Sequence, residues 1–346
     1  MKTWDQGQIL ITGGAGFIGS AILWELNRRG FNHILICDTL GRDERFRNLI
    51  PLHFADIFSP QDLLASIANN DTKLADIGCI FHLGACANTA ETDADFLIQN
   101  NYEFSKKLAE WAVSKNIRFV YASSAATYGN GIFGMSDEEK ELPTLRSLNM
   151  YGYSKHLFDL YAHRRGLLPY IYGMKYFNIF GPNEYHKGPM MSFIPRGIQQ
   201  LAEKGALHLF KSYRPDCVHG EQTRDFLYVK DAAKISLFLA ELPQDINHPN
   251  GGIYNIGSGV ASRWLDLAQA ISHAMGLSPR MEFIDMPETL KACYQYHTQA
   301  NIQKLRKIGY IQEITPLEEA VRDYVQNYLL PSKKYLGEEV SIRFLS

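Results

Sequence analysis

The chain has 346 residues, of which 46% are apolar and 21% charged, so it can bury a substantial core in one large domain or two coupled ones. Its net charge of −2 at pH 7 gives no electrostatic reason to expect binding to nucleic acid or to an anionic membrane. Its five cysteines lack paired spacing, and no apolar run resembles a signal or a membrane span, which predicts a cytoplasmic protein without disulfides or a metal site.

A glycine-rich turn joins the first predicted strand to the first predicted helix. The apolar run 8–11 predicts a buried strand, and apolar residues at helical spacing predict a helix over 18–29. The intervening Thr-Gly-Gly-Ala-Gly-Phe-Ile-Gly lets the backbone approach a pyrophosphate at a helix N-terminus. We therefore expect a dinucleotide here, and its predicted contacts are Gly13, Gly16, Phe17, Ile18 and Gly19.

The end of the second predicted strand, 34–37, bears on the choice between NAD and NADP. Asp38 follows the glycines by about twenty residues, where an acid hydrogen-bonds a ribose 2′-hydroxyl and favours NAD. Arg42, Arg45 and Arg47 follow at once, and guanidinium groups favour a 2′-phosphate and hence NADP, unless they lie in a solvated loop. These residues leave both cofactors open, with Thr39 and Arg45 as further predicted contacts.

Strands and helices continue to alternate through the first half of the chain. Strands are predicted at 53–55, 79–83, 119–122 and 172–178, and helices at 60–68 and from Asn100 to about Ser114. This alternation predicts an α/β fold with a doubly wound parallel sheet, whose ligands lie at the carboxyl ends of the strands. The cofactor contacts predicted in this part of the chain are Leu83, Gly84, Ala85, Cys86 and Asn100.

Tyr151 and Lys155 are four residues apart in a predicted helix, so their side chains point the same way. A phenol has a pKa of about 10 and is a poor base at neutral pH. An ammonium about 4 Å away, at an effective dielectric near 20, favours the phenolate by roughly 4 kcal/mol, which lowers the pKa by about 3. Such a tyrosine takes a proton from a sugar hydroxyl while a nicotinamide takes the hydride. For a lone pair of this kind, two unrelated surface residues are the alternative.

Ser124 lies in the segment Ser-Ser-Ala-Ala-Thr-Tyr-Gly, which follows the predicted strand 119–122. Its hydroxyl can hydrogen-bond the substrate oxygen that Tyr151 deprotonates, whereas a serine in a turn is the simpler interpretation. The glycine-rich turn, this serine segment and the Tyr-x-x-x-Lys pair occur in one order along the chain. Together they indicate an active site.

These motifs resemble the extended short-chain dehydrogenase/reductase family, the nucleotide-sugar epimerases and dehydratases, over nearly the whole chain. The resemblance implies that Ser124, Tyr151 and Lys155 are catalytic. The segment Asn-Ile-Phe-Gly-Pro-Asn-Glu-Tyr-His-Lys-Gly at 178–188 is similar to the heptose 6-epimerase branch, as is Ser-Lys-His-Leu-Phe-Asp at 154–159. In that branch a lysine is the second acid/base, which here is Lys187.

Epimerisation explains why a second acid/base is useful. Hydride leaves one face of a carbinol carbon and returns to the other, so the new alcohol needs its own proton donor unless the sugar rotates. Lys187 can serve only if burial lowers its pKa. A lysine that pairs with a phosphate is the alternative.

The resemblance implies further contacts in the second half of the chain. Additional cofactor contacts are Ile179, Lys155 and Lys187. Substrate contacts are Ser124, Asn178, His186, Arg196, Phe210, Ser212, Arg224 and Tyr294. Two departures from the family pattern stand out, an inserted-looking loop at 213–222 and Pro189 in place of a serine.

The remaining predicted elements are helices at 193–204 and 264–275, a strand at 207–212, and a late strand and turn at 252–259, with Asp231 capping a helix. The predicted domains are a Rossmann domain over 1–178, to which 225–257 returns, and a smaller interleaved substrate domain over 179–330. We see no chemistry in the tail, 331–346.

The resemblance implies an NADP-dependent epimerase of ADP-heptose at C6, in lipopolysaccharide core heptose biosynthesis, working as a homo-oligomer that is described as pentameric in that branch. A 4,6-dehydratase is disfavoured because Ala125 and Ala126 occupy the places of its acidic pair. A UDP-hexose 4-epimerase stays open, since only His186-Lys187-Gly188 argues against it. A non-catalytic NADP-binding sensor predicts decay of the tyrosine or the lysine, yet both are present.

Overall fold

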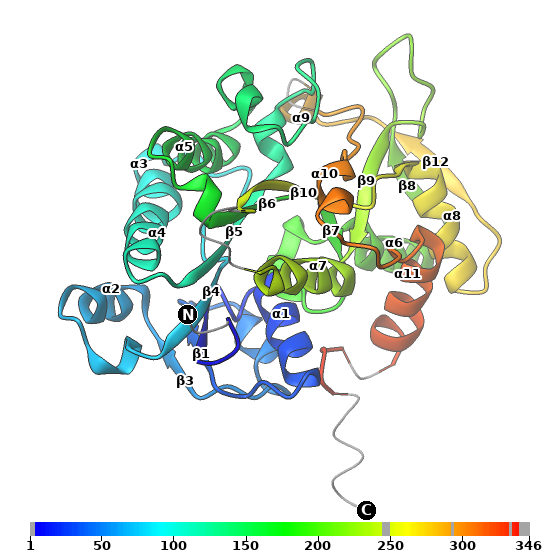
Figure 1. Cartoon of the computed structure of the whole chain (residues 1–346). Coiled ribbons are helices and arrows are strands. Elements are labelled where there is room, and N and C mark those ends of the chain that lie inside the picture. The colour runs from blue at the N-terminus through cyan, green and yellow to red at the C-terminus, as the bar shows by residue number, and fades with distance from the viewer. Residues whose placement is uncertain (1–3, 244–249, 292–293, 332–333, 339–346) are drawn as a thin grey trace, which may run out of the picture.

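The computed structural model describes residues 4–243, 250–291, 294–331 and 334–338 (Figure 1). Its centre is a seven-stranded parallel sheet in the order β10-β6-β5-β4-β1-β2-β3. The strands are β1 (Gln8–Thr12), β2 (Ile34–Cys37), β3 (Asp56–Phe58), β4 (Ile77–His82), β5 (Arg118–Ser124), β6 (Ile171–Tyr176) and β10 (Gly252–Ile256). The predicted doubly wound parallel sheet is thus confirmed.

Both faces of the large sheet are buried, which explains the continuous apolar runs of its strands. Successive side chains of a strand point to opposite faces. Ile9 and Ile11 accordingly enter one apolar core, and Leu10 enters the other. The same alternation in β2 sends Ile36 to the first core and Leu35 to the second.

Helices cover the two faces in separate groups (Figure 1). The first face packs against α1 (Phe17–Arg28) and α7 (Val229–Glu241), which also contact each other. The second face packs against α2 (Pro60–Ala68), α4 (Phe104–Ser114) and α5 (Met150–Arg164). Short helical segments connect these layers: η1 (Glu44–Asn48), η2 (Thr72–Leu74), α3 (Ala94–Leu97), the π-helical η3 (Ile98–Glu103), η4 (Ala125–Tyr128), η5 (Glu139–Thr144) and η6 (Leu168–Tyr170).

A smaller part of the chain packs beside the large sheet. It holds two small sheets, one of β7 (Asn178–Phe180), β9 (Thr223–Tyr228) and β11 (Ala261–Arg263), the other of β8 (Leu207–Phe210) and β12 (Met281–Ile284). Its helices are η7 (Tyr185–Met190), α6 (Phe193–Lys204), α8 (Trp264–Ala274), α9 (Glu288–Lys291), α10 (Gln303–Lys307), α11 (Leu317–Tyr324) and the π-helical η8 (Val325–Leu329). After β9 the chain returns to the large sheet as α7 and β10, so the two parts are interleaved. The exact domain boundaries stay a prediction.

Several predicted element boundaries were wrong. The strand predicted at 53–55 lies at Asp56–Phe58, because the ladder to β2 pairs Leu35 with Asp56. The strand predicted at 172–178 is two strands, since the chain leaves the large sheet after β6 and Asn178 begins β7. The strand predicted at 207–212 ends at Phe210.

The predicted helix starts and caps also needed correction. The helix predicted to begin at Asn100 begins at α3, where the Asp93 side chain accepts the Phe96 N–H, and continues through a π-helical stretch. Asp231 does not cap α7, because Tyr228 is the cap residue and the Asp231 carboxylate accepts the Thr315 N–H at 2.9 Å. Within the described ranges, no helix is both long and apolar enough to span a membrane.

Candidate active site

Tyr151 stands at the start of α5, packed against the turn that carries Ser124. The Asn149 side chain caps the helix by accepting the Gly152 N–H at 2.8 Å. A Cβ at Gly152 would lie 2.8 Å from the Ala126 carbonyl oxygen, so only glycine permits this approach of helix and turn. Ser124 thereby reaches Tyr151 and hydrogen-bonds to it.

Burial dominates the electrostatics of this pair. It raises the pKa of Tyr151, although the hydrogen bond from Ser124 acts in the opposite direction. Burial also lowers the pKa of Lys155 to about 8, and its ammonium donates to the Ala122 carbonyl at 3.0 Å. The expectation that Lys155 lowers the pKa of Tyr151 is therefore wrong. The reason is that desolvation of the phenolate outweighs the other influences on Tyr151.

Asn101 joins the segment after β4 to helix α5, which carries Tyr151, and the sequence did not reveal this role. Its fully buried amide accepts the Cys86 N–H at 2.8 Å and donates to the Cys86 carbonyl at 3.0 Å. It also donates to Ser154 Oγ at 2.9 Å, and Ser154 donates to the Tyr151 carbonyl at 2.7 Å. The pair Asn100-Asn101 was a visible signal, but the π-helical stretch decides which member points inward. Asn100 is exposed, and its role as a cofactor contact stays a prediction.

The glycine-rich turn packs directly onto the end of β4. Gly13 has a φ of +70°, and a Cβ there would lie 2.7 Å from the Gly84 nitrogen. A Cβ at Gly19 would lie 2.1 Å from the Gly13 carbonyl oxygen. Thr12 Oγ1 accepts the Gly84 N–H at 3.0 Å, which further ties the two segments together. The structure thus brings together the two predicted groups of cofactor contacts, around Gly13 and around Gly84.

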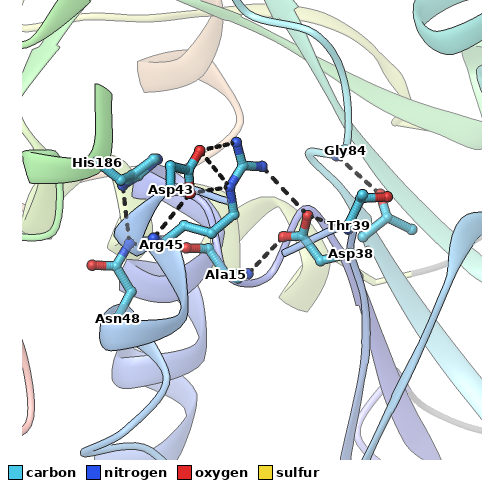
Figure 2. A network of polar contacts seen from close by, with 9 residues as sticks. Ala15, Asp38, Thr39, Asp43, Arg45, Asn48, Gly84 and His186 are labelled. Carbon is cyan, nitrogen blue, oxygen red and sulfur yellow. Dashed lines mark hydrogen bonds and ion pairs between the residues drawn. The ribbon is translucent and has the colours of Figure 1, made fainter. Parts of the chain in front are cut away.

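Asp38 and Arg45 lie side by side next to this turn (Figure 2). The Asp38 carboxylate accepts the N–H of Ala15 at 2.8 Å and that of Thr39 at 2.7 Å. Arg45 places Nη1 3.7 Å from Asp38 Oδ1, while its fork binds Asp43, with Nη2 2.7 Å from Oδ2. The acid that favours NAD and the arginine that favours NADP therefore occupy one place, which is why the sequence left both cofactors open.

Lys187 lies in η7, on a segment that faces the glycine-rich turn at 12–19. We call this turn the cofactor turn. Its Nζ is 5.0 Å from the centre of the Phe17 ring, at the first residue of α1. Burial lowers the pKa of Lys187, although the nearby Glu184 acts in the opposite direction. The neighbouring His186 has Nδ1 3.4 Å from Asn48 Nδ2, and burial lowers its pKa to about 4 (Figure 2). The lowered pKa that an acid/base lysine requires is present.

A buried cation lies among the predicted substrate contacts of the second half of the chain. Arg224 on β9 is buried, its guanidinium lies 4.9 Å from the centre of the Tyr294 ring, and burial lowers its pKa. No carboxylate of the described residues forms an ion pair with it. A buried guanidinium in this state suits an anionic ligand.

The loop at 213–222 folds back over the same region. Ser212 donates its N–H to His219 Nδ1 at 3.0 Å and accepts the Arg214 N–H at 3.2 Å. The Arg214 guanidinium lies 5.1 Å from the centre of the Tyr296 ring. The loop therefore adds a second arginine, which pairs with Asp216 and packs on Tyr296, whose ring centre lies 5.3 Å from that of Tyr294.

The other predicted substrate contacts are joined to the site less directly. Asn178 and Ile179 lie on β7, where Asn178 pairs with Phe226 of β9, and Phe210 ends β8. Arg196 on α6 is exposed, and its described hydrogen bond goes to the Met191 carbonyl at 3.4 Å. The structure does not bring Arg196 into contact with the other predicted site residues, so its role stays a prediction.

The chain is similar to known proteins over most of its length. The NAD dependent epimerase/dehydratase family matches residues 9–257. An ADP-L-glycero-D-manno-heptose-6-epimerase of Nitratidesulfovibrio vulgaris is 43% identical over 327 residues, covering 94% of this chain and 99% of the relative. One of Fusobacterium nucleatum is 44% identical over 337 residues, covering 95% and 100%. The solved UDP-N-acetylglucosamine 4-epimerase of Methanobrevibacter ruminantium is similar with a TM-score of 0.76 and 27% identity, covering 94% of this chain and 98% of that one.

Proposed function

The chain belongs to the NAD dependent epimerase/dehydratase family, and on that premise we propose that it converts ADP-D-glycero-D-manno-heptose to ADP-L-glycero-D-manno-heptose by inverting C6. Relatives with this name match it at 43% and 44% identity over nearly their whole length. The structural observation that carries the proposal is Lys187, a half-buried lysine whose amine lies over Phe17, on an element separate from Tyr151. Two acid/bases on separate elements suit a reaction that creates an alcohol on either face of one carbon.

The proposed chemistry is a transient oxidation at C6. A bound nicotinamide dinucleotide supplies the acceptor and then the donor of the hydride, so it is not consumed. Tyr151 takes the hydroxyl proton of one epimer, with Ser124 holding the same oxygen, and Lys187 gives or takes the proton of the other epimer. Lys155 holds the nicotinamide ribose and keeps a positive charge one helical turn from Tyr151.

We propose NADP as the preferred cofactor. The Asp38 carboxylate already accepts two backbone N–H groups, from Ala15 and Thr39, and so has a structural role within the turn. Arg45 is half-exposed and lies beside Asp38, which leaves a guanidinium in position for a 2′-phosphate.

The four described cysteines are free thiols, which supports the reducing cytoplasm as the location of the protein. By resemblance to the heptose branch, we further propose a homo-oligomer, a pentamer, that serves lipopolysaccharide core heptose biosynthesis.

The decisive experiment is incubation of the purified protein with ADP-D-glycero-D-manno-heptose, followed by NMR of the C6 centre. We expect a mixture of the two C6 epimers at equilibrium, without net consumption of cofactor. An unchanged C6 centre, together with conversion of UDP-glucose to UDP-galactose, would establish the second candidate, a UDP-hexose 4-epimerase. That candidate is supported by the likeness to the UDP-sugar epimerase of Methanobrevibacter ruminantium.

A further inference from the structure

The chain end packs on the segment that carries Lys187. We call residues 334–338 the C-terminal strap, and Gly181 to Met191 the Lys187 loop. Leu336 in the strap is 0% exposed and belongs to the core that covers the first face of the large sheet. A Cβ at Gly337 would lie 2.9 Å from a methyl carbon of Leu52 and 3.0 Å from the Pro51 carbonyl oxygen. The strap is therefore fitted into a specific place between the Lys187 loop and the cofactor-binding part.

Two hydrogen bonds join the strap to the Lys187 loop. The Leu336 N–H donates to Asn183 Oδ1 at 3.0 Å, and the Tyr185 hydroxyl donates to the Lys334 carbonyl at 2.8 Å. The rings of Tyr185 and Tyr335 add an edge-to-face contact with centres 5.4 Å apart. Both loop partners lie just before Lys187 in sequence.

Asn183 has a backbone conformation that its surroundings must stabilise. Its φ is +77°, a left-handed conformation that a residue with a side chain adopts only when other contacts secure it. Its fully buried side chain uses both ends, since Nδ2 donates to Ser20 Oγ at 2.9 Å while Oδ1 accepts from the strap. Asn183 thus connects the strap, the Lys187 loop and helix α1, whose first residue is Phe17.

Other contacts fix the remainder of the loop. Asn48 donates to the Asn183 carbonyl at 3.1 Å and to the Ala15 carbonyl at 2.9 Å, which ties the loop to the cofactor turn. Buried Glu184 accepts the N–H of Ser192 at 2.6 Å and the hydroxyl of Tyr324 at 3.2 Å. The strap completes this set of contacts. Without it, Asn183 Oδ1 and the Tyr185 hydroxyl lose the hydrogen bonds to Leu336 and Lys334.

We propose that the C-terminal strap is a positioning element of the reaction, which holds Lys187 at the cofactor turn through Asn183 and Tyr185. The proposal rests on the proposed function, because it concerns the epimer whose C6 proton Lys187 handles. A displacement of the order of 1 Å at an acid/base group can lower a rate by about 100-fold. Loss of the strap should therefore slow the half of the reaction that uses Lys187 more than the half that uses Tyr151.

The test measures formation of reduced cofactor by its ultraviolet absorbance in a single turnover, started separately from each C6 epimer. Lys187→Met first identifies which epimer depends on Lys187. Deletion of residues 334–346 should then lower the rate for that same epimer by about 10- to 100-fold and leave the other within about twofold. Deletion of residues 339–346 is the matched control, because it keeps every contact described for the strap, and we expect it to match the parent protein.

Full-chain variants keep the proposal testable if the shortened protein does not fold. Tyr185→Phe removes the bond to Lys334 and keeps the ring contacts, and Asn183→Gly keeps the left-handed backbone but removes both side-chain bonds. Both should slow the Lys187-dependent epimer selectively. Equal slowing of both epimers, or no slowing, in variants with a normal thermal transition overturns the proposal. If Lys187→Met itself shows no epimer preference, the second acid/base of the proposed function is wrong, and the positioning role falls with it.

Discussion

Tyr151 and Lys187, the two proposed acid/bases, are held in place by different kinds of structure. Tyr151 stands in the first turn of the long helix α5, directly over a strand end of the large sheet. Lys187 stands in a short irregular segment that depends on groups from distant parts of the chain, among them the Asn48 side chain and the Leu336 backbone N–H. Regular secondary structure therefore fixes one group, and long-range hydrogen bonds fix the other. Substitutions around the two groups should accordingly have different effects on the reaction.

The largest expected effect is at Tyr151. Tyr151→Phe keeps the ring and removes the proton carrier, so we expect turnover to fall by about 10²- to 10⁴-fold with unchanged thermal stability. Tyr153→Phe is the matched control on the same helix, since Tyr153 is exposed and should tolerate the change. Undiminished epimerisation by the Tyr151 variant, followed by NMR, would remove the catalytic assignment of Tyr151.

Arg45 belongs to the polar network that ends at the Lys187 loop. Its substitution tests whether this network also selects the cofactor. Arg45→Ala should weaken NADP binding by about 10- to 150-fold, the loss expected for a hydrogen bond to a charged group, while NAD binding changes little. Arg42→Ala, three residues earlier and exposed, is the control. Dissociation constants from fluorescence titration with each dinucleotide would decide the matter. Equal weakening of NAD and NADP would contradict the proposed preference.

Two buried asparagines allow a direct comparison of the regions. Asn101→Ala removes the hydrogen bonds to Ser154 Oγ and Cys86 on the Tyr151 side, and Asn48→Ala removes those to the Ala15 and Asn183 carbonyls on the Lys187 side. Each should lower the free energy of unfolding by about 1–3 kcal/mol.

Single-turnover cofactor reduction then separates the two variants. We expect Asn48→Ala to slow only the epimer that depends on Lys187, and Asn101→Ala to slow the epimer that depends on Tyr151. Asn100→Ala is the control for stability, because Asn100 is exposed and its removal should leave unfolding unchanged. The same epimer profile in both asparagine variants would mean that the two regions do not act separately.

The contrast between the regions also explains what the sequence revealed. The large sheet, the glycine-rich turn and the Ser124–Tyr151 pairing follow from periodic apolar residues and short motifs, and the structure shows all three. Asn48, Asn101 and Asn183 were missed because their roles come from contacts across long stretches of chain or from a π-helical stretch that no local pattern marks. The packing of residues 334–338 on the Lys187 loop depends on the same kind of long-range contact, which no local pattern marks. The pKa of Tyr151 was predicted in the wrong direction because local spacing gives a neighbouring charge but not the degree of burial.

The smallest expected effect, for each unit of pH, is a pH dependence of the free energy of unfolding. It comes from a histidine on the Tyr151 side. His82 at the end of β4 accepts the Thr12 hydroxyl at Nδ1 over 2.6 Å and donates from Nε2 to Ser105 Oγ over 2.8 Å, because Ser105 itself donates to the Asn101 carbonyl. Burial lowers the pKa of His82 from 6.5 to about 3, with the charge of Lys155 adding to the effect. The neutral ring is therefore part of the fold.

The sign of this dependence follows from the lowered pKa. Between pH 6.5 and about 3 the unfolded chain binds a proton at His82 that the folded chain does not, so acidification favours unfolding over this range. The contribution is at most about 1.4 kcal/mol for each pH unit. His82→Gln keeps one acceptor and one donor without the titration, and should flatten the fall of unfolding free energy with pH in urea melts. His186→Gln on the Lys187 loop is the comparison, since His186 also has a lowered pKa but is only half-buried. A slope that His82→Gln leaves unchanged would show that other groups, and not this buried hydrogen-bond chain, govern the acid sensitivity of the large sheet.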